Sequence, residues 1–251
     1  AKERLSFSMI NYNQVYKETW ENSSFLSKNK RLLIIFYLYI EVAKELDSEI
    51  VFHKFFDLLD EESSLDIIQF EKDWNFIIEK IKLGLAHELS EGDTSYLGAG
   101  TKGTGGATTS QPFSDIPATT RAFTLKQSYF TTIVKQFKNE KIEGESLFKD
   151  LKEPVSIEEF IERKLSPYYG KTEEELANEL GIVISQQNPQ KQLRRQIIDK
   201  LLGLRGGKTK VIEFTKSQTT LKVIKLEENG RLVESISFPT FKYLDLIEQE
   251  W

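Results

Sequence analysis

The chain has 251 residues, of which 39% are hydrophobic and 12% aromatic; this excludes a disordered polypeptide and suffices for one large domain or two modest ones. Its net charge of −5 argues, taken alone, against a nonspecific nucleic-acid binder. The absence of cysteine excludes disulfides, thiolate catalysis and Cys-type zinc sites, and no apolar run is long enough to span a bilayer. We therefore expect a cytoplasmic protein without membrane contact.

In the first half of the chain, short apolar segments flank a long amphipathic stretch. Strand patterns or apolar runs occupy residues 4–12, 32–40, 49–59 and 121–126. The run at 32–40 is also compatible with a helix. Helical patterns occupy residues 12–21, 66–84 and 129–137, and apolar spacing in the second predicts one buried face. Residues 98–111 are rich in glycine and threonine, which predicts a loop.

The composition changes around Pro154, and we place a domain boundary there, between residues 1–150 and 151–251. Beyond it, helical patterns occupy residues 157–165, 172–180 and 191–202. The second of these opens with Thr172 and Glu175, the spacing of a capping box, and stops at Gly181. Strand patterns follow at 211–214, 219–227 and 231–238, and the dipeptide Asn229-Gly230 predicts a tight hairpin between the last two.

Basic residues gather in two islands on this acidic chain. Residues 96–138 hold five basic residues against one acid, and residues 190–210 hold seven against one. Such runs are often solvated helix faces, but they are also what a phosphate-facing surface needs.

The sequence at the end of the chain is similar to the sequence at its beginning. With a shift of 231 residues, Ser6 meets Ser237, Phe7 meets Phe238, Tyr12 meets Tyr243 and Trp20 meets Trp251. Ala1 and Trp251 also look like internal positions of something longer. We therefore interpret the chain as the middle of a duplicated protein, in which the counterpart of residues 213–222 precedes Ala1.

Residues 213–222 have the spacing of a metal-dependent nuclease centre with one acid missing. Such centres place two acids and a lysine on neighbouring strands, where the carboxylates bind Mg²⁺ and the lysine assists hydrolysis. Here Glu213 and Lys222 are present, but Thr220 stands where the second acid belongs. An exposed cross-strand pair of Glu213 and Lys222 is the alternative. Asp199, on the basic helix before these strands, is a further candidate metal ligand or a helix-surface partner of Arg195.

Three cations of the first basic island are candidate DNA contacts. Lys102 stands in a glycine-flanked segment that can enter a groove and donate to guanine, or form a mobile solvent loop. Arg121 and Lys126 are spaced to reach phosphates from one short segment, or to pair with acids at a strand edge.

These segments together resemble the MutH family, which includes a GATC-directed repair nickase and GATC-cutting type II restriction endonucleases. Residues 171–182 are similar to the family's GxTxxELAxxLGI helix, and 193–203 to its GQLLExxLG helix, with Asp199 at the glutamate. Glu213-Phe214 matches its DF, and Leu221-Lys222 the end of its ELK. Residues 81–102 are similar to IxxGxxxxITxRxGExLxxRPKA, and 121–131 to PRGFYLKxxFT. Gly100 and Thr101 replace the expected Arg-Pro.

The resemblance implies an α/β, restriction-endonuclease-like fold with a mixed sheet flanked by helices. Residues 1–150 would be the DNA-recognition arm of a first copy, with Lys102 contacting GATC bases, and 151–251 the opening arm of a degenerate second copy. It further implies double-stranded DNA as substrate, Mg²⁺ in the intact enzyme and association of two copies on DNA. The segment itself is expected to be inactive because of Thr220. A non-catalytic effector module and a mismatch-repair nickase are the alternatives, as is a scaffold without any DNA role.

Overall fold

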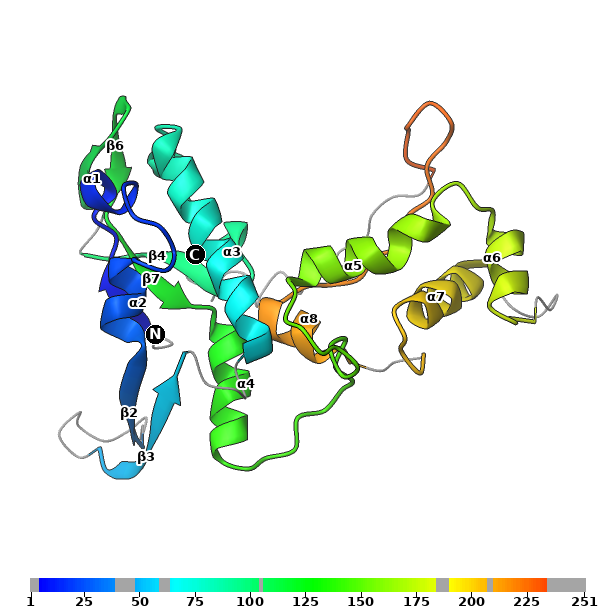
Figure 1. Ribbon diagram of the computed structural model, residues 1–251, viewed down its shortest axis with the longest axis horizontal. Coiled ribbons are helices and arrows are strands. Elements are labelled where there is room, and N and C mark those ends of the chain that lie inside the picture. Colours follow the sequence, from blue (N-terminus) through cyan, green and yellow to red (C-terminus); the bar gives the residue numbers. More distant parts are fainter. Residues whose placement is uncertain are drawn as a thin grey trace, which may run out of the picture.

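A computed structural model describes residues 5–38, 48–58, 64–103, 106–183, 190–206 and 210–233 (Figure 1). The strands are β1 (Ser6–Met9), β2 (Arg31–Tyr37), β3 (Ile50–Asp57), β4 (Leu97–Thr101), β5 (Thr108–Gln111), β6 (Ser114–Thr119) and β7 (Arg121–Leu125). The α-helices are α1 (Tyr12–Val15), α2 (Ser24–Asn29), α3 (Ser64–Lys82), α4 (Gln127–Phe137), α5 (Ile157–Leu165), α6 (Glu173–Glu179), α7 (Gln190–Leu201) and α8 (Ile212–Ser217). Short 3₁₀ helices are η3 (Ala86–Glu88), η4 (Glu91–Asp93) and η5 (Ser166–Tyr168).

The strands form one small sheet and two separate ribbons. The sheet has the order β1-β7-β4, and β2-β3 and β5-β6 are two-stranded ribbons. All of these pairs are antiparallel, and an isolated parallel bridge joins Glu145 to Val211. The expected α/β class is confirmed.

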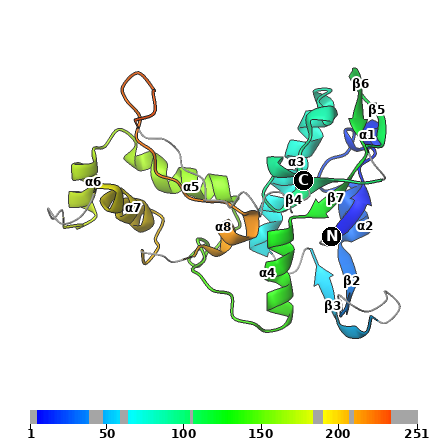
Figure 2. The ribbon, with the colours of Figure 1, turned by 180° about the vertical axis from the view of Figure 1, so that it is seen from behind.

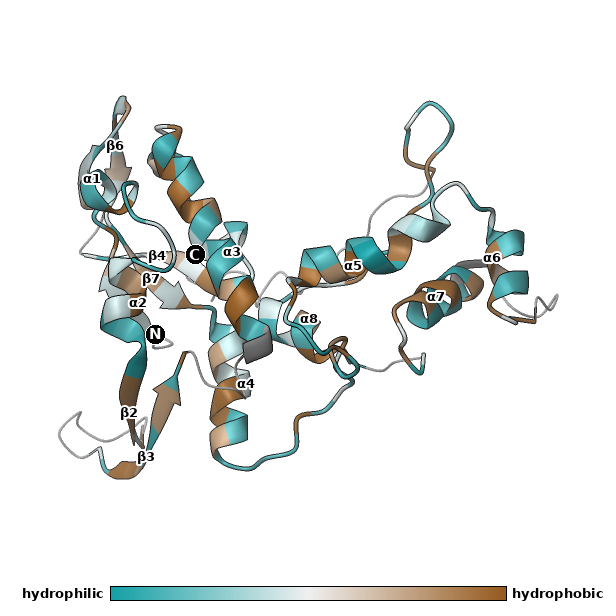
Figure 3. Ribbon diagram, viewed as in Figure 1, coloured by the Kyte–Doolittle hydropathy of each residue, from teal (hydrophilic) through white to brown (hydrophobic). Residues whose placement is uncertain are grey.

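Helix α3 lies at the centre of the packing, as its amphipathic sequence predicts. Its buried face carries Phe70, Trp74, Ile77 and Ile81, and the Trp74 ring lies 5.9 Å from that of Trp20. Figure 3 shows apolar bands along α3 and apolar colour over β2 and β3. None of the helices in the described ranges has the length and apolar character that a membrane crossing requires.

Helices α5 to α7 extend away from the sheet, and α8 lies between the two groups in both ribbon views (Figures 1 and 2). A small core of Ala177, Leu193, Ile197 and Leu201 joins α6 to α7. The main core nevertheless continues past residue 150, because Phe160, Leu204 and Phe214 belong to it. The domain boundary therefore stays a prediction, and packing is continuous across it.

The predicted loop at 98–111 is wrong at both ends, because β4 extends to Thr101 and β5 begins at Thr108. The glycines of β4 serve close packing rather than turning. A Cβ placed on Gly100 would lie 2.7 Å from Cγ2 of Thr124 on the neighbouring strand β7. Glycine at position 100 therefore leaves room for the Thr124 side chain, so that β4 and β7 can pair closely at this point.

The predicted strands at 211–214 and 219–227 are also wrong. Residues 212–217 form α8, which ends at Gln218 in the left-handed conformation, with φ of 58°. Between 219 and 233 the structure has one isolated bridge, Leu226 to Leu232, closed by the predicted turn. In that turn the Arg231 N–H donates to the Asn229 side chain at 2.9 Å.

The remaining expectations are met in part. Helix α1 covers four residues rather than the predicted 12–21. The capping box of Thr172 and Glu175 is present at the start of α6, and Gly181 follows the helix with φ of 63°. The second copy of the repeat, 235–251, and the end of the return strand lie outside the described residues.

Candidate nucleic-acid interface

Lys102 and Arg121 lie together at the end of the three-stranded sheet. Strands β4 and β7 pair so that Thr101 stands opposite Arg121. Lys102 follows β4 directly, and its main-chain N–H donates to the carbonyl oxygen of Thr120 at 2.9 Å. The structure therefore brings both cations to the point where the β5–β6 ribbon leaves the sheet.

The guanidinium group of Arg121 is held across the end of β4. Its Nη1 donates to the Ala99 carbonyl oxygen at 2.7 Å and to Thr101 Oγ1 at 3.4 Å. Its Nε is buried and makes no hydrogen bond within the described ranges. Because a guanidinium has five donors, Arg121 can be oriented by β4 and still offer N–H groups to an anion.

Lys102 is half-buried, and no acid of the described residues forms an ion pair with it. Gly103 follows with φ of 94°, a conformation that glycine adopts without strain. Among the described residues no acid neutralises the charge of Lys102, which suits a base or phosphate contact.

Lys126 occupies a different environment from the predicted one. It precedes α4, is only 8% exposed, and its Nζ donates to the main-chain carbonyl of Glu91. Its main-chain N–H donates to Tyr96 at 2.9 Å. Lys126 therefore ties β7 to η4 and the start of β4, and in this arrangement its ammonium group is not on the surface.

Asp73 positions the same strand, and the sequence interpretation did not single it out. This α3 carboxylate accepts main-chain N–H groups from Ser95 at 3.1 Å, Tyr96 at 2.6 Å and Leu97 at 2.9 Å. Gln69 donates a fourth hydrogen bond at 3.0 Å. Burial raises the pKa of Asp73, whereas these hydrogen bonds act in the opposite direction. The sequence did contain a signal for this role, because the acid Asp73 stands between Phe70 and Ile77 on the buried, apolar face of α3.

Glu213 lies in a helix, not on a strand, and its carboxylate is occupied. The side chain is 3% exposed and accepts hydrogen bonds from Ser146 Oγ at 2.6 Å and the Leu147 N–H at 2.9 Å. These bonds attach α8 to the segment that follows α4. The exposed ion pair between Glu213 and Lys222 is excluded by this burial.

The other residues of the predicted centre are not assembled around Glu213. Thr220 and Lys222 lie in a non-helical, non-strand segment after α8, both exposed. Asp199 lies in α7, is 1% exposed, and pairs with Arg195 Nε at 2.9 Å, while its Oδ2 is buried without a hydrogen bond. The pairing of Asp199 with Arg195 matches the alternative to a metal ligand, although the carboxylate is buried rather than on the helix surface.

These positions do not fit a magnesium centre. Within the residues that the structure describes, no three acids or histidines gather closely enough to hold a metal ion. Glu213 already accepts two hydrogen bonds, and Thr220 cannot supply an anionic oxygen.

A buried ion pair, which the sequence interpretation missed, joins α8 to α3. Lys216 Nζ lies 2.5 Å from Asp66 Oδ2, and the Tyr129 hydroxyl donates to the same oxygen at 3.1 Å. The ammonium group also lies over the rings of Tyr96 and Tyr129, at 5.8 and 5.4 Å from their centroids. Burial, reinforced by Asp66, raises the pKa of both tyrosines, which keeps them neutral.

Comparison of the sequence with known proteins shows the family to which the chain belongs. Residues 1–69 match the family described as DNA mismatch repair enzyme MutH. Over 266 aligned residues the chain is 36% identical to the type II restriction enzyme Sau3AI of Staphylococcus aureus, and the alignment covers 100% of the chain. The chain belongs to the MutH-like family that includes this enzyme. It spans about half the length of that relative, 52%.

The MutH-like chain thus has two unequal candidate regions. The family match ends within α3, so Lys102 and Arg121 lie beyond it, inside the longer alignment with the restriction enzyme. Where β4 and β7 pair, the fold orients Arg121 and Lys102, which can still contact a ligand. The carboxylates of Glu213 and Asp199, by contrast, are bound by groups of the protein itself.

Proposed function

We propose that the chain binds double-stranded DNA at GATC as part of a type II restriction endonuclease that hydrolyses phosphodiester bonds in the intact protein. The observation that carries this proposal is the pairing of Lys102 and Arg121 at the β4–β7 joint, in a chain related throughout its length to a type II restriction enzyme. In the proposal Lys102 reads bases, Arg121 contacts a phosphate, and Lys126 holds β7 in place. A DNA substrate also favours a cytoplasmic location.

The chain should bind a GATC duplex more tightly than a scrambled duplex of equal length, and both affinities should fall as salt rises. Replacing Lys102 with alanine should weaken GATC binding by about 1–3 kcal/mol and reduce the preference for GATC, because base contacts carry sequence information. Fluorescence anisotropy at two salt concentrations measures both effects.

Lys54→Ala is the matched control, since Lys54 is an exposed lysine on β3 and its loss changes the net charge equally. Equal losses from Lys102→Ala and Lys54→Ala would reduce the proposal to a generally basic surface. Complete absence of salt-sensitive binding would favour the scaffold that the charge of −5 suggests.

The chain alone should not cut DNA. At concentrations where it binds a GATC duplex, we expect no cleavage with Mg²⁺, because Thr220 replaces an acid and Glu213 is engaged by Ser146 and Leu147. Thr220→Asp should remain inactive for the second of these reasons. A gel assay for nicked and linear plasmid checks this, and robust GATC cutting by the chain would refute our account of Thr220.

In this proposal the Mg²⁺ of the intact enzyme is bound by acids other than Asp199 and Glu213, and the segments that carry Asp199, Glu213 and Lys222 serve as scaffold. Two alternatives share the DNA-binding surface. A non-catalytic effector module predicts that no upstream acid-acid-lysine motif exists, and a repair nickase predicts single-strand cuts by the intact protein. Association of two copies on one DNA is proposed from the family resemblance, and light scattering of the DNA complex tests it.

A further inference from the structure

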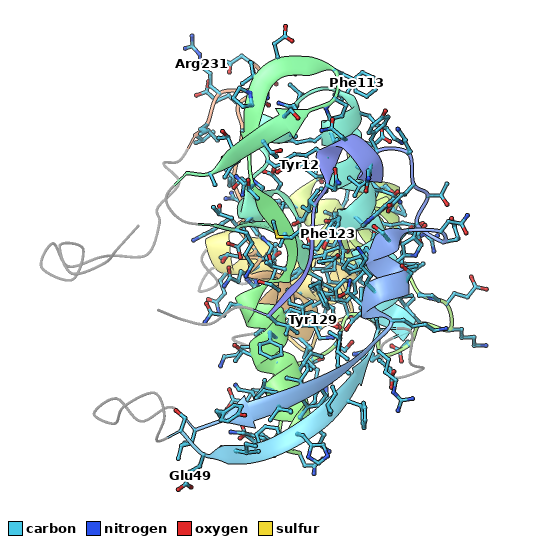
Figure 4. All side chains as sticks on the ribbon, turned by 90° about the vertical axis from the view of Figure 1, so that its left-hand side faces the viewer. Tyr12, Glu49, Phe113, Phe123, Tyr129 and Arg231 are labelled. Carbon is cyan, nitrogen blue, oxygen red and sulfur yellow. The ribbon has the colours of Figure 1, made fainter. Side chains whose placement is uncertain are left out.

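The β5–β6 ribbon ends in an exposed aromatic residue on strained backbone. Gln111 and Ser114 pair across the tip, and Pro112 and Phe113 form the two-residue loop between them. Phe113 is 68% exposed and has φ of 63°. A bulky residue at positive φ is a true outlier, since glycine or asparagine takes this position at lower cost. Figure 4 shows Phe113 at the outer end of the ribbon.

The tip is held firmly in spite of this strain. Gln111 donates to the Ile116 carbonyl oxygen at 2.6 Å and accepts from the Ala86 N–H at 2.8 Å. On the other side, Gly84 packs so closely that a Cβ there would lie 2.5 Å from the Phe113 carbonyl oxygen. The fold therefore fixes the backbone at Phe113 from two directions while leaving the ring outside.

Among the described residues, Tyr16 is the aromatic partner of the Phe113 ring. Tyr16 of the segment after α1 meets it edge to face, with centroids 5.2 Å apart and planes at 78°. The exposed Lys17 ammonium lies 5.3 Å from the centroid of the Tyr16 ring. A cation thus lies beside the aromatic tip, where Phe113 remains exposed.

The ribbon is nearly uncharged and lies beside the two cations of the proposed DNA surface, Lys102 and Arg121. Exposed Thr108, Thr109 and Ser110 on β5 offer neutral hydrogen-bonding groups, and Asp115 is the only acid of residues 106–120. The ribbon is also rooted at Lys102 and Arg121, through the hydrogen bond from Lys102 to Thr120. A two-stranded ribbon fits a DNA groove, and apolar side chains inserted between base steps kink duplexes.

We propose that Phe113 is an apolar wedge that inserts between stacked bases of the duplex beside the sequence read at Lys102. The proposal rests on the proposed DNA-binding function and adds to it a distortion of the DNA. Strained residues persist where the surrounding structure enforces them and function uses them, and here the enforcing contacts come from Gln111 and Gly84.

The test replaces Phe113 with glycine, which removes the ring and relieves the positive φ. We expect the melting temperature to stay the same or rise. Affinity for the GATC duplex should fall about tenfold, because an aromatic ring stacked on bases contributes that order of binding. Duplexes with 2-aminopurine at successive positions around GATC should brighten at one position on binding the wild-type chain, and this signal should vanish with Phe113→Gly.

Two further variants separate insertion from simple contact. Phe113→Trp retains an aromatic wedge and should keep the 2-aminopurine signal. Phe76→Ala removes another exposed phenylalanine, 42% exposed on α3, and should change neither affinity nor signal.

The possible outcomes separate a failure of the wedge from a failure of the proposed DNA-binding function. If the wild-type chain does not bind duplex DNA, the proposed function fails and the wedge fails with it. If it binds but Phe113→Gly leaves affinity or the 2-aminopurine signal unchanged, the wedge alone is overturned. A drop in melting temperature for Phe113→Gly would also overturn it, since the residue would then be retained for packing.

Discussion

Lys216→Met should lower the free energy of unfolding by about 3–5 kcal/mol, because it leaves the buried Asp66 carboxylate without its charge partner. The Lys216 and Asp66 side chains are 10% and 8% exposed, and the pair joins α8 to α3 across 150 residues of sequence. After the substitution, the Tyr129 hydroxyl still donates to Asp66 Oδ2, but it carries no positive charge. Urea unfolding followed by circular dichroism measures the loss.

Two comparisons isolate the cause. Lys210→Met breaks the exposed pair with Glu143 and should leave the stability almost unchanged, because solvent screens this pair. The double variant Lys216→Met with Asp66→Leu should be more stable than Lys216→Met alone, because no uncompensated charge stays buried. If Lys216→Met and Lys210→Met lose equal stability, the buried pair does not hold α8 to α3.

Asp73→Ala should lower the free energy of unfolding by about 3–5 kcal/mol, because three main-chain N–H donors lose their common acceptor at the start of β4. Strand β4 ends at Thr101, directly before Lys102, so the same change should also weaken DNA binding under conditions where the variant remains folded. Denaturation and anisotropy on the same preparation measure both effects.

Asp115→Ala provides the matched control, since Asp115 is exposed on β6 and its removal should alter stability by no more than about 0.5 kcal/mol. Stability of Asp73→Ala within the same range would mean that water replaces the lost acceptor and that β4 does not depend on α3. If a destabilised Asp73→Ala variant keeps its preference for GATC, recognition does not depend on the way Asp73 positions β4.

The proposed recognition segment and the proposed degenerate centre differ in how the fold uses their charges. Arg121 is anchored through one nitrogen, which leaves other donors for a ligand. Glu213 is anchored through both carboxylate oxygens, so its charge stabilises the connection between α8 and residues 146–147. This contrast explains why the chain can bind DNA in our proposal and yet lack a cutting centre.

Local pattern and burial were readable from the sequence. The apolar spacing of α3, the capping box of α6 and the Asn-Gly turn before Arg231 were predicted because each depends on residues a few positions apart. The β4 glycines and α8 were not, since their conformations depend on partners distant in sequence. Gly100 lies against Thr124, and α8 is held by Ser146 and Asp66.

By itself the sequence determined the α/β class, the amphipathic helix, the family resemblance and the absence of a second acid at Thr220. Only the tertiary structure decided that Lys102 and Arg121 meet at one joint, that Lys126 is buried, and that Glu213 faces Ser146 rather than Lys222. The physical reason is that a charge acquires its role from the groups that surround it. Those groups come from segments that pair or pack only when the whole chain folds.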